Sequence, residues 1–509
     1  MLFVIIFSMQ KSIIYSVAII VAVLAAQAAP VIDNTPTRVQ TTLNPALPLK
    51  GCLVPKDVSR VSSSRWSVDV AGTDREHASY IAVREYLPPL GIRRLRTQAG
   101  WARCEKEKGM YDFRWLDQIV FDAAKRNLEV WLETSYGNPI YKGGGGRGLA
   151  GGMPTSEEAL AAWDKWVRAL AKRYKGYVLD WCVWNEPDLR GANSISEIIP
   201  FTVRTAEIIK SEIPDARIAA CALTWANVEF IRPFCTALKA SGKESLFKWI
   251  AYHHYNYNPD DGYDAEIAAM RKVVKELTPS LELWQNESGT QSEWCKAGAI
   301  NNRPWTELKQ AKWNLRRYIA DLGLGDYTGV FHACDLEYVN SGFHDGLVRY
   351  GLIKTAGQAD DYRVLKVKMA YYAVQNAVSV FNDALEPLPK DKGGATISGE
   401  GRTAFYVFRD RASGSLVPVF WNSSKEPSDL NNVSKVTVSV PARPFKSPVW
   451  VDVLTGNVYA IAKENVSVKD GKTIYSSLPC YDSPSFICEE AMIEYAVPEV
   501  VKYAHKEAL

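Results

Sequence analysis

The sequence predicts an α/β fold, a (β/α)8 TIM barrel followed by a C-terminal β-sandwich domain, on three observations. Between residues 66 and 383, short apolar runs alternate with longer segments of helical period, which implies parallel strands joined by right-handed crossovers. There are eight such units, the number that closes a barrel of this type. After residue 384, helical period gives way to short strand-like runs separated by turn signals, as in a sandwich.

The barrel strands are expected at eight apolar or β-branched runs: residues 66–70, 92–97, 129–135, 178–185, 217–223, 249–255, 281–286 and 328–334. Between them, residues 115–126, 157–175 and 264–277 each have one apolar face at helical spacing. An open doubly wound sheet is the alternative. It usually carries a glycine-rich phosphate turn after its first strand, and Ala71-Gly72-Thr73-Asp74 is no such turn.

The N-terminal residues 1–28 have the pattern of a signal peptide. Lys11 precedes an apolar stretch over residues 13–26, and Ala26-Gln27-Ala28 is a small-residue cleavage site. A transmembrane anchor is the alternative, but the stretch is short and no later stretch is long enough to span a bilayer. We therefore expect an exported protein that is secreted, periplasmic or at the cell surface, without a membrane-spanning segment in its mature chain.

The remaining domain boundaries follow from changes in residue pattern. Residues 29–60 are expected to form a linker that can supply an extra strand to the sandwich, residues 61–383 the barrel, residues 384–497 the sandwich and residues 498–509 a tail. The sandwich strands are expected at residues 404–409, 416–421, 435–440, 448–453, 466–468 and 485–488. Cys480 and Cys488 lie on either side of a turn-like segment, and we expect them to form a disulfide in an oxidising compartment.

The composition excludes some classes of function. Sixty Lys and Arg balance 57 Asp and Glu, and no basic run is present, which argues against a nucleic-acid binder. No Cys/His cluster has the spacing of a zinc site, so we expect neither a metal nor an organic cofactor. The oligomeric state cannot be read from the sequence. The 16 Trp and 25 Tyr are suited to stacking on sugars, or simply to filling a large core.

Two glutamates end predicted strands of the barrel. Asn185-Glu186-Pro187 closes the fourth strand and Asn286-Glu287 closes the seventh, and the carboxyl ends of barrel strands carry active residues. Exposed loop glutamates are the alternative, but the same Asn-Glu pair at two strand ends disfavours it. Two carboxyl groups across one cavity are what glycosidic cleavage requires: a separation of about 5–5.5 Å implies retention of configuration, and about 6.5–9.5 Å implies inversion.

At these residues the chain resembles clan A glycoside hydrolases, and most closely family 39, the β-xylosidase and α-L-iduronidase family. Residues 90–98, 100–103 and 105–113 also resemble the second β/α unit of that family. The resemblance implies a retaining enzyme with Glu186 as acid/base and Glu287 as nucleophile. It further implies that Arg96 lies beside the nucleophile and that Asn185 binds the sugar 2-hydroxyl.

The sixth strand resembles the clan's His-x-Tyr pattern at His253 and Tyr255, which implies that the tyrosine contacts the nucleophile. The neighbouring Tyr252 and His254 leave the register open, and a histidine pair that binds metal is the other interpretation.

Five more residues are candidates for sugar binding. Trp101, Tyr136, Asn138 and Trp225 follow strands and form either sugar-stacking walls or core packing, while Glu337 either binds sugar hydroxyls or pairs with a nearby cation. The glycine-rich residues 143–152 lack the ending of a phosphate-binding loop, so we expect them to cover the barrel mouth.

We therefore predict an exported retaining glycoside hydrolase, acting on a plant- or matrix-type glycan in the manner of a β-xylosidase. A non-catalytic carbohydrate-binding protein and an inverting hydrolase are the alternatives, and the sugar itself stays open.

Overall fold

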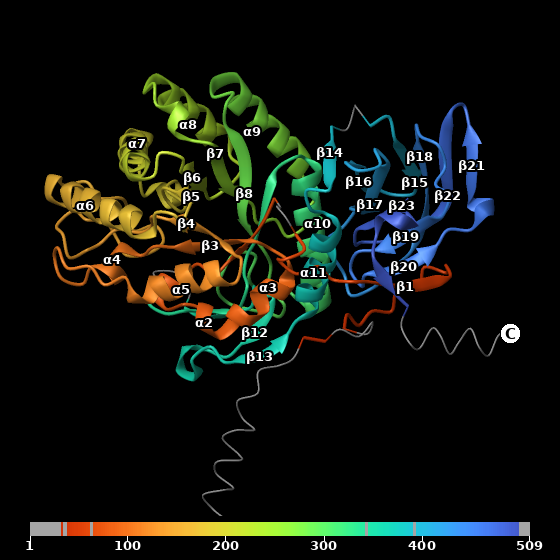
Figure 1. Ribbon diagram of the computed structural model, residues 1–509, viewed down its shortest axis with the longest axis horizontal. Coiled ribbons are helices and arrows are strands. Elements are labelled where there is room, and N and C mark those ends of the chain that lie inside the picture. Colours follow the sequence, from red (N-terminus) through yellow and green to blue (C-terminus); the bar gives the residue numbers. More distant parts are fainter. Residues whose placement is uncertain (1–31, 34–37, 62–64, 342–344, 390–392, 498–509) are drawn as a thin grey trace, which may run out of the picture.

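A computed structural model describes residues 32–33, 38–61, 65–341, 345–389 and 393–497. Its larger part is a closed barrel of eight strands, every neighbouring pair parallel (Figure 1). The strands are β2 (Trp66–Asp69), β3 (Arg94–Gln98), β4 (Glu129–Glu133), β5 (Asp180–Cys182), β6 (Arg217–Leu223), β7 (Trp249–His253), β8 (Glu282–Ser288) and β9 (Tyr327–Val330). The predicted fold class is confirmed.

Amphipathic helices surround this barrel. The longer ones are α5 (Arg114–Lys125), α6 (Glu157–Tyr174), α7 (Ile195–Glu212), α8 (Val228–Ala240), α9 (Tyr263–Leu277), α10 (Glu307–Gly323) and α11 (Met369–Val380), and the short ones are α2 (Tyr80–Val83), α3 (Leu87–Leu90) and α4 (Trp101–Cys104). Helix α6 begins where the Ser156 side chain accepts a hydrogen bond from the amide of Ala159, and two glutamates occupy its first turn. Both features stabilise a helix N-terminus.

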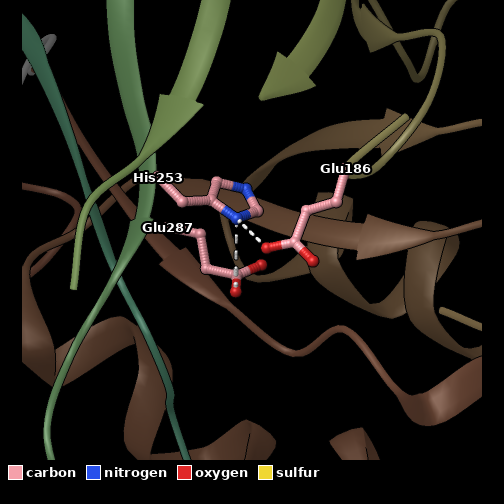
Figure 2. A group of neighbouring side chains, drawn as sticks. All are labelled: Glu186, His253 and Glu287. Carbon is pink, nitrogen blue, oxygen red and sulfur yellow. Dashed lines mark hydrogen bonds and ion pairs between the residues drawn. The ribbon is translucent and has the colours of Figure 1, made fainter. Parts of the chain in front are cut away.

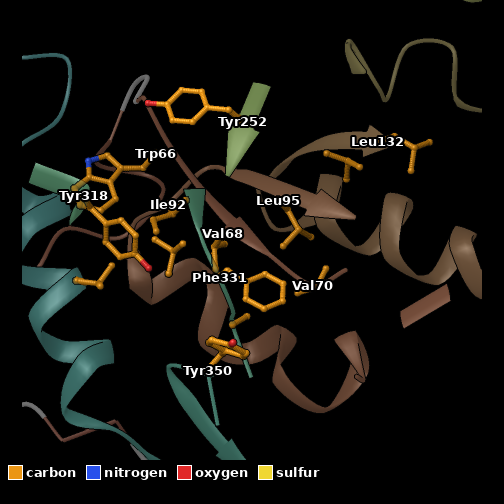
Figure 3. Close-up of a cluster of buried hydrophobic side chains, with 14 of the residues drawn as sticks. Trp66, Val68, Val70, Ile92, Leu95, Leu132, Tyr252, Tyr318, Phe331 and Tyr350 are labelled. Atoms are coloured by element: carbon orange, nitrogen blue, oxygen red, sulfur yellow. The ribbon is translucent and has the colours of Figure 1, made fainter. Parts of the chain in front are cut away.

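The centre of the barrel is filled by tryptophans. Trp131 and Trp284 stack with ring centroids 3.8 Å apart, and Trp249 meets Trp284 edge-on. Small residues such as Ala219 and Ala251 leave the room that these rings need. A second layer, in which Trp66 and Val68 of β2 pack towards Tyr318 of α10, joins the barrel to its helices (Figure 3). The barrel is therefore a packed core and not a pore.

The C-terminal part is a sandwich of two antiparallel sheets. The eight-stranded sheet has the order β14 (Leu385–Leu388), β16 (Thr403–Asp410), β17 (Leu416–Asn422), β23 (Ser485–Glu489), β19 (Pro448–Asp452), β20 (Asn457–Ala460), β1 (Leu49–Leu53) and β24 (Tyr495–Ala496). The four-stranded sheet has the order β15 (Thr396–Gly399), β18 (Ser434–Val440), β22 (Lys472–Cys480) and β21 (Val466–Lys469). Strand β1 comes from the segment before the barrel and pairs with β20 and β24.

The expected disulfide between Cys480 and Cys488 is wrong, because both thiols are free and buried. Cys480 packs into the core between the two sheets, whereas Cys488 lies on the other sheet and packs into the core that faces the barrel. Successive side chains of a strand point to opposite faces. Ile487 therefore fills the space between the sheets, and its neighbour Cys488 points away from Cys480.

Two hairpins stand between β9 and α11. Strand β10 (Leu336–Tyr338) pairs with β11 (Gly346–Val348), and β12 (Ile353–Thr355) pairs with β13 (Val364–Val367). Helices α10 and α11 lie between the barrel and the sandwich (Figure 1). The predicted signal peptide, and the tail over residues 498–509, lie outside the described residues. Among the helices that the structure describes, none has the length and apolar character needed to cross a membrane.

Candidate active site

A cavity of about 400 Å³ opens at the carboxyl ends of the barrel strands. Among the side chains that line it are Glu186, Glu287, Asn185, Tyr255 and Trp225. The hairpin β10–β11 adds Leu336 and Tyr338 to the wall, and the glycine-rich segment after β4 adds Leu149. The site residues therefore lie where the fold class places its active sites.

Glu186 and Glu287 approach one another across this cavity (Figure 2). One carboxylate oxygen of each residue lies within 4.8 Å of the other, although 100 residues separate them along the chain. Glu287 lies inside β8, and Glu186 follows β5 with its amide donating to the carbonyl of Ala222 at 2.7 Å. The φ angle of Glu186 is 49°, a left-handed conformation that costs a non-glycine residue free energy and is often found at functional positions.

Arg96 connects the two strand ends. It is fully buried, and Nη1 donates to Glu287 Oε2 at 2.6 Å while Nη2 donates to Asn185 Oδ1 at 2.6 Å. Two further buried carboxylates, Asp69 and Glu133, accept from the same guanidinium. A buried cation needs such partners to offset its loss of hydration, so Arg96 is held in one position against Glu287.

The surroundings move the pKa values of the two glutamates in opposite directions. For Glu186 burial is the largest influence, and together with the charge of Glu287 it raises the pKa of the carboxyl above its usual value. Burial acts in the same direction on Glu287, but His253, Arg96 and the Tyr255 hydroxyl favour the anion. The net result is a lowered pKa for Glu287. One carboxyl is thus set to hold a proton while the other is ionised, which is the division that acid and nucleophile need.

His253 lies between the two glutamates. Its Nδ1 is 2.8 Å from Glu186 Oε1 and 3.6 Å from Glu287 Oε1 (Figure 2). Burial opposes protonation of the imidazole, but the two carboxylates outweigh it and raise the pKa of His253. These three side chains have the donor types that bind divalent metals. The 2.8 Å contact is the length of a hydrogen bond, however, and a shared proton accounts for it.

The structure settles which residues of the sixth barrel strand face the cavity. The Tyr255 hydroxyl donates to Glu287 Oε1 at 2.8 Å. His254 points away from Glu186 and Glu287 and meets Glu266 at 2.7 Å, and the Tyr252 hydroxyl meets that of Tyr263 at 3.0 Å. Of the two adjacent histidines, therefore, His253 is the one that contacts Glu186.

Three of the expected sugar-binding residues lie away from the cavity, and two more, Arg96 and His253, are fully buried beside the glutamates without lining it. Trp101 is buried among Trp163, Trp166 and Tyr141, in the core behind the barrel strands. The Asn138 side chain is also buried and donates to the backbone carbonyl of Glu105 at 2.8 Å. The carboxylate of Glu337 accepts from the amide of Gln358 at 2.6 Å. Two of the four aromatic or amide candidates line the cavity: Trp225, half-buried over His254, and Tyr136, whose hydroxyl accepts from the Asn185 amide at 2.7 Å.

Several residues around the site were not expected from the sequence. Asp69 ends β2 beside Arg96, and burial together with the charge of Glu287 raises its pKa to about 7 against the opposing effect of Arg96. Arg75 and Gln98 also line the cavity. The position of Asp69 at a strand end was the available signal, since the first strand also ends at the barrel mouth.

Known proteins share this architecture. A family model described as beta-galactosidase (Glyco_hydro_42) matches residues 86–140, and no curated protein sequence matches the chain. A family 39 glycoside hydrolase from Bacteroides cellulosilyticus WH2 superposes with a TM-score of 0.58 at 16% identity, over 84% of this chain and 81% of that one. Two further structures are similar. A GH30 endoxylanase from Clostridium papyrosolvens C71 has a TM-score of 0.53 at 12% identity, over 87% of this chain and 99% of that one. A monomeric beta-xylosidase from Caulobacter crescentus CB15 has a TM-score of 0.51 at 15% identity, over 87% of this chain and 98% of that one.

The chain thus has the fold class of clan A glycoside hydrolases, a barrel with an attached sandwich. The similar structures include members of glycoside hydrolase families 39 and 30. The predicted resemblance to family 39 is confirmed at the level of the fold.

Proposed function

We propose that the protein is an exported, retaining glycoside hydrolase that uses Glu186 as acid/base and Glu287 as nucleophile. One observation carries the proposal: two carboxyl groups with opposite pKa shifts lie within 4.8 Å across a cavity at the barrel mouth. Export rests on the N-terminal sequence pattern alone.

The first step of the reaction breaks the glycosidic bond. Glu287 attacks the anomeric carbon as a carboxylate, while Glu186 gives its proton to the departing oxygen. The products are a glycosyl ester on Glu287 and a free alcohol. Because Glu186 is then ionised, it takes a proton from a water molecule that attacks the same carbon. This second step releases the sugar and restores both carboxyl groups to their starting states.

The neighbouring side chains support these two roles. Arg96 and Tyr255 donate to Glu287 and stabilise its anion before attack. His253 lies within hydrogen-bonding distance of Glu186 and holds its carboxyl in place. Asn185 is fixed by Arg96 and Tyr136 at the cavity wall, where its amide is positioned to bind a sugar hydroxyl.

The separation of the two carboxyl groups favours this mechanism over its alternatives. An inverting hydrolase keeps them about 6.5–9.5 Å apart to admit a water molecule. Here one carboxylate oxygen of Glu186 lies within 4.8 Å of one carboxylate oxygen of Glu287, which is a shorter distance. A non-catalytic carbohydrate-binding protein would have no need for two buried, oppositely shifted carboxyl groups. Structures named for xylan and xyloside hydrolysis share the fold, and we propose plant- or matrix-type glycans as the source of substrate.

Azide rescue tests the assignment of both residues. Glu287→Ala should lose hydrolysis of an activated aryl glycoside, and added azide should restore turnover with a glycosyl azide of inverted configuration. Glu186→Ala in the same assay should give a glycosyl azide of retained configuration. Unchanged activity of Glu287→Ala, or the same azide product from both variants, contradicts the proposal. Glycan binding by the wild-type chain without turnover, across a broad panel, would instead support the non-catalytic alternative.

A further inference from the structure

Arg75 forms part of the wall of the cavity that Glu186 and Glu287 also line. It ends the short 3₁₀ helix η1 (Thr73–Arg75) that follows β2. Its Nη2 donates to Gln98, its Nε donates to Asp74 at 3.3 Å, and its guanidinium lies 4.7 Å above the ring of Tyr136. These three contacts fix the guanidinium plane. Among the described residues Nη1 has no hydrogen-bond partner, and Arg75 lines the cavity.

A second, smaller cavity adjoins the first at Arg75 and Tyr136, which line both. This basic annex has a volume of about 160 Å³ and is lined by Asp74, Arg75, Glu76, Gly100, Ala102, Arg103, Lys106, Tyr136 and Arg147. Four of these side chains are cationic and two are carboxylates. Asp74 is buried and pairs with Arg75, and the largely exposed Glu76 pairs with Arg103, so the cations that line the annex outnumber its carboxylates by four to two.

The loop after β4 brings one of these cations to the annex. Arg147 is exposed within the glycine-rich segment, and Gly148 lies so close to Arg75 that a Cβ there would be 3.7 Å from Arg75 Cδ. His77 also lines the main cavity, but burial, followed by the charge of Arg75, lowers its pKa to about 4. The positive charge on this side of the site therefore comes from lysine and arginine and persists across the physiological pH range.

A neutral sugar gains little from a cluster of cations beyond ordinary hydrogen bonds, whereas an oxyanion gains charge-assisted ones. We propose that the substrate is a glycan bearing a carboxylate or sulfate group, and that this group binds Arg75 where the basic annex adjoins the main cavity. The inference rests on the proposed glycosidase function and names the substrate class of the same cavity. A planar carboxylate and a tetrahedral sulfate both suit a guanidinium, and substrate pairs distinguish them.

The test compares each acidic glycan with its neutral counterpart. One pair is an aryl β-glucuronide and the matching aryl β-glucoside, together with a uronate polysaccharide before and after carboxyl reduction. The other pair is a sulfated oligosaccharide before and after desulfation. The ratio of kcat/KM values, acidic over neutral, should reach at least about tenfold in one pair, as one charge-assisted hydrogen bond predicts. Added salt should lower that ratio.

Variants connect the ratio to the annex. Arg75→Gln should reduce it about tenfold, and Arg147→Gln, at an exposed position that tolerates substitution, should reduce it in the same direction. Arg443→Gln removes an exposed arginine from the sandwich and serves as the matched control, with an unchanged ratio. Ratios of one or below in every pair, or a ratio that neither annex variant lowers, overturn the inference.

The two proposals fail separately. If the enzyme hydrolyses only the neutral glycans, and does so through Glu287, the acidic substrate class is refuted and the glycosidase proposal stands. If no pair is hydrolysed, calorimetric titration of Glu287→Gln with the same glycans decides. Tighter binding of the acidic form that Arg75→Gln abolishes supports the substrate class, whereas equal or absent binding of both forms overturns it.

Discussion

Tyr255→Phe removes one hydrogen bond to Glu287 and leaves the ring in place. The Tyr255 hydroxyl donates to Glu287 Oε1 at 2.8 Å and stabilises the carboxylate over the neutral acid. Its loss should therefore raise the pKa of Glu287. The acidic limb of the kcat/KM profile follows the ionisation of the nucleophile in the free enzyme, so this limb should move to higher pH.

The structure sets the size of the effect. A hydrogen bond to a charged group contributes about 1.5–3 kcal/mol, and about 1.4 kcal/mol corresponds to one pKa unit or a tenfold change in rate. Arg96 and His253 remain beside Glu287 in the variant and retain most of its stabilisation. We therefore expect the lower end of that range, a shift of the acidic limb by about one unit, so that kcat/KM falls about tenfold at pH values below that limb.

The assay is hydrolysis of an aryl glycoside as a function of pH, and Tyr338→Phe is the control. Tyr338 lines the same cavity, and the hydrogen bonds of Glu287 in the described structure come from Arg96 and Tyr255, not from Tyr338. The acidic limb of Tyr338→Phe should stay where it is in the wild type. An acidic limb of Tyr255→Phe that does not move, or moves to lower pH, would refute the assignment of Glu287 as the ionised nucleophile.

Three further predictions concern the acid, the cofactor and the thiols. Glu186→Gln should lower kcat/KM about 10²–10⁴-fold on substrates with poor leaving groups but far less on dinitrophenyl glycosides. The alkaline limb of its pH profile should disappear, because the raised pKa of Glu186 sets that limb in the wild type. Equal losses of kcat/KM on both substrates would argue against an acid role. Dialysis against EDTA should leave kcat/KM unchanged, since a shared proton accounts for the contact of His253 with Glu186; a loss that zinc restores would assign a metal to these residues. Thiol titration of the protein, denatured without a reductant, should count nine free thiols. A count of seven would indicate one disulfide.

The barrel could be predicted because its signal is repeated. Each strand is a short apolar run buried on both faces, and each helix has one apolar face, so eight independent units support one another. Glu186 and Glu287 could be predicted because a carboxylate that ends such a run lies at the barrel mouth. The segment before the barrel was expected to be able to supply a strand to the sandwich, and β1 does so; its partner β20 is distant in sequence, and local pattern does not contain that choice.

Other features depended on side-chain direction, which the sequence does not contain. Trp101 follows a strand as Trp225 does, yet it packs against α6 because helix residues Trp163 and Trp166 offer it an apolar surface. The pairing of Cys480 with Cys488 failed for the same kind of reason, since the two cysteines lie on different sheets and pack into different cores. The partners of Arg96 come from four different strand ends, and only the closed barrel brings them together.

Covalent trapping is the most direct measurement of the central claim. A 2-deoxy-2-fluoro glycoside with a good leaving group, built on whichever sugar the enzyme hydrolyses, should inactivate it and add one sugar mass to the protein. Peptide mass spectrometry should place that mass on Glu287. A label on any other residue, or a first-formed product of inverted anomeric configuration, would contradict the account.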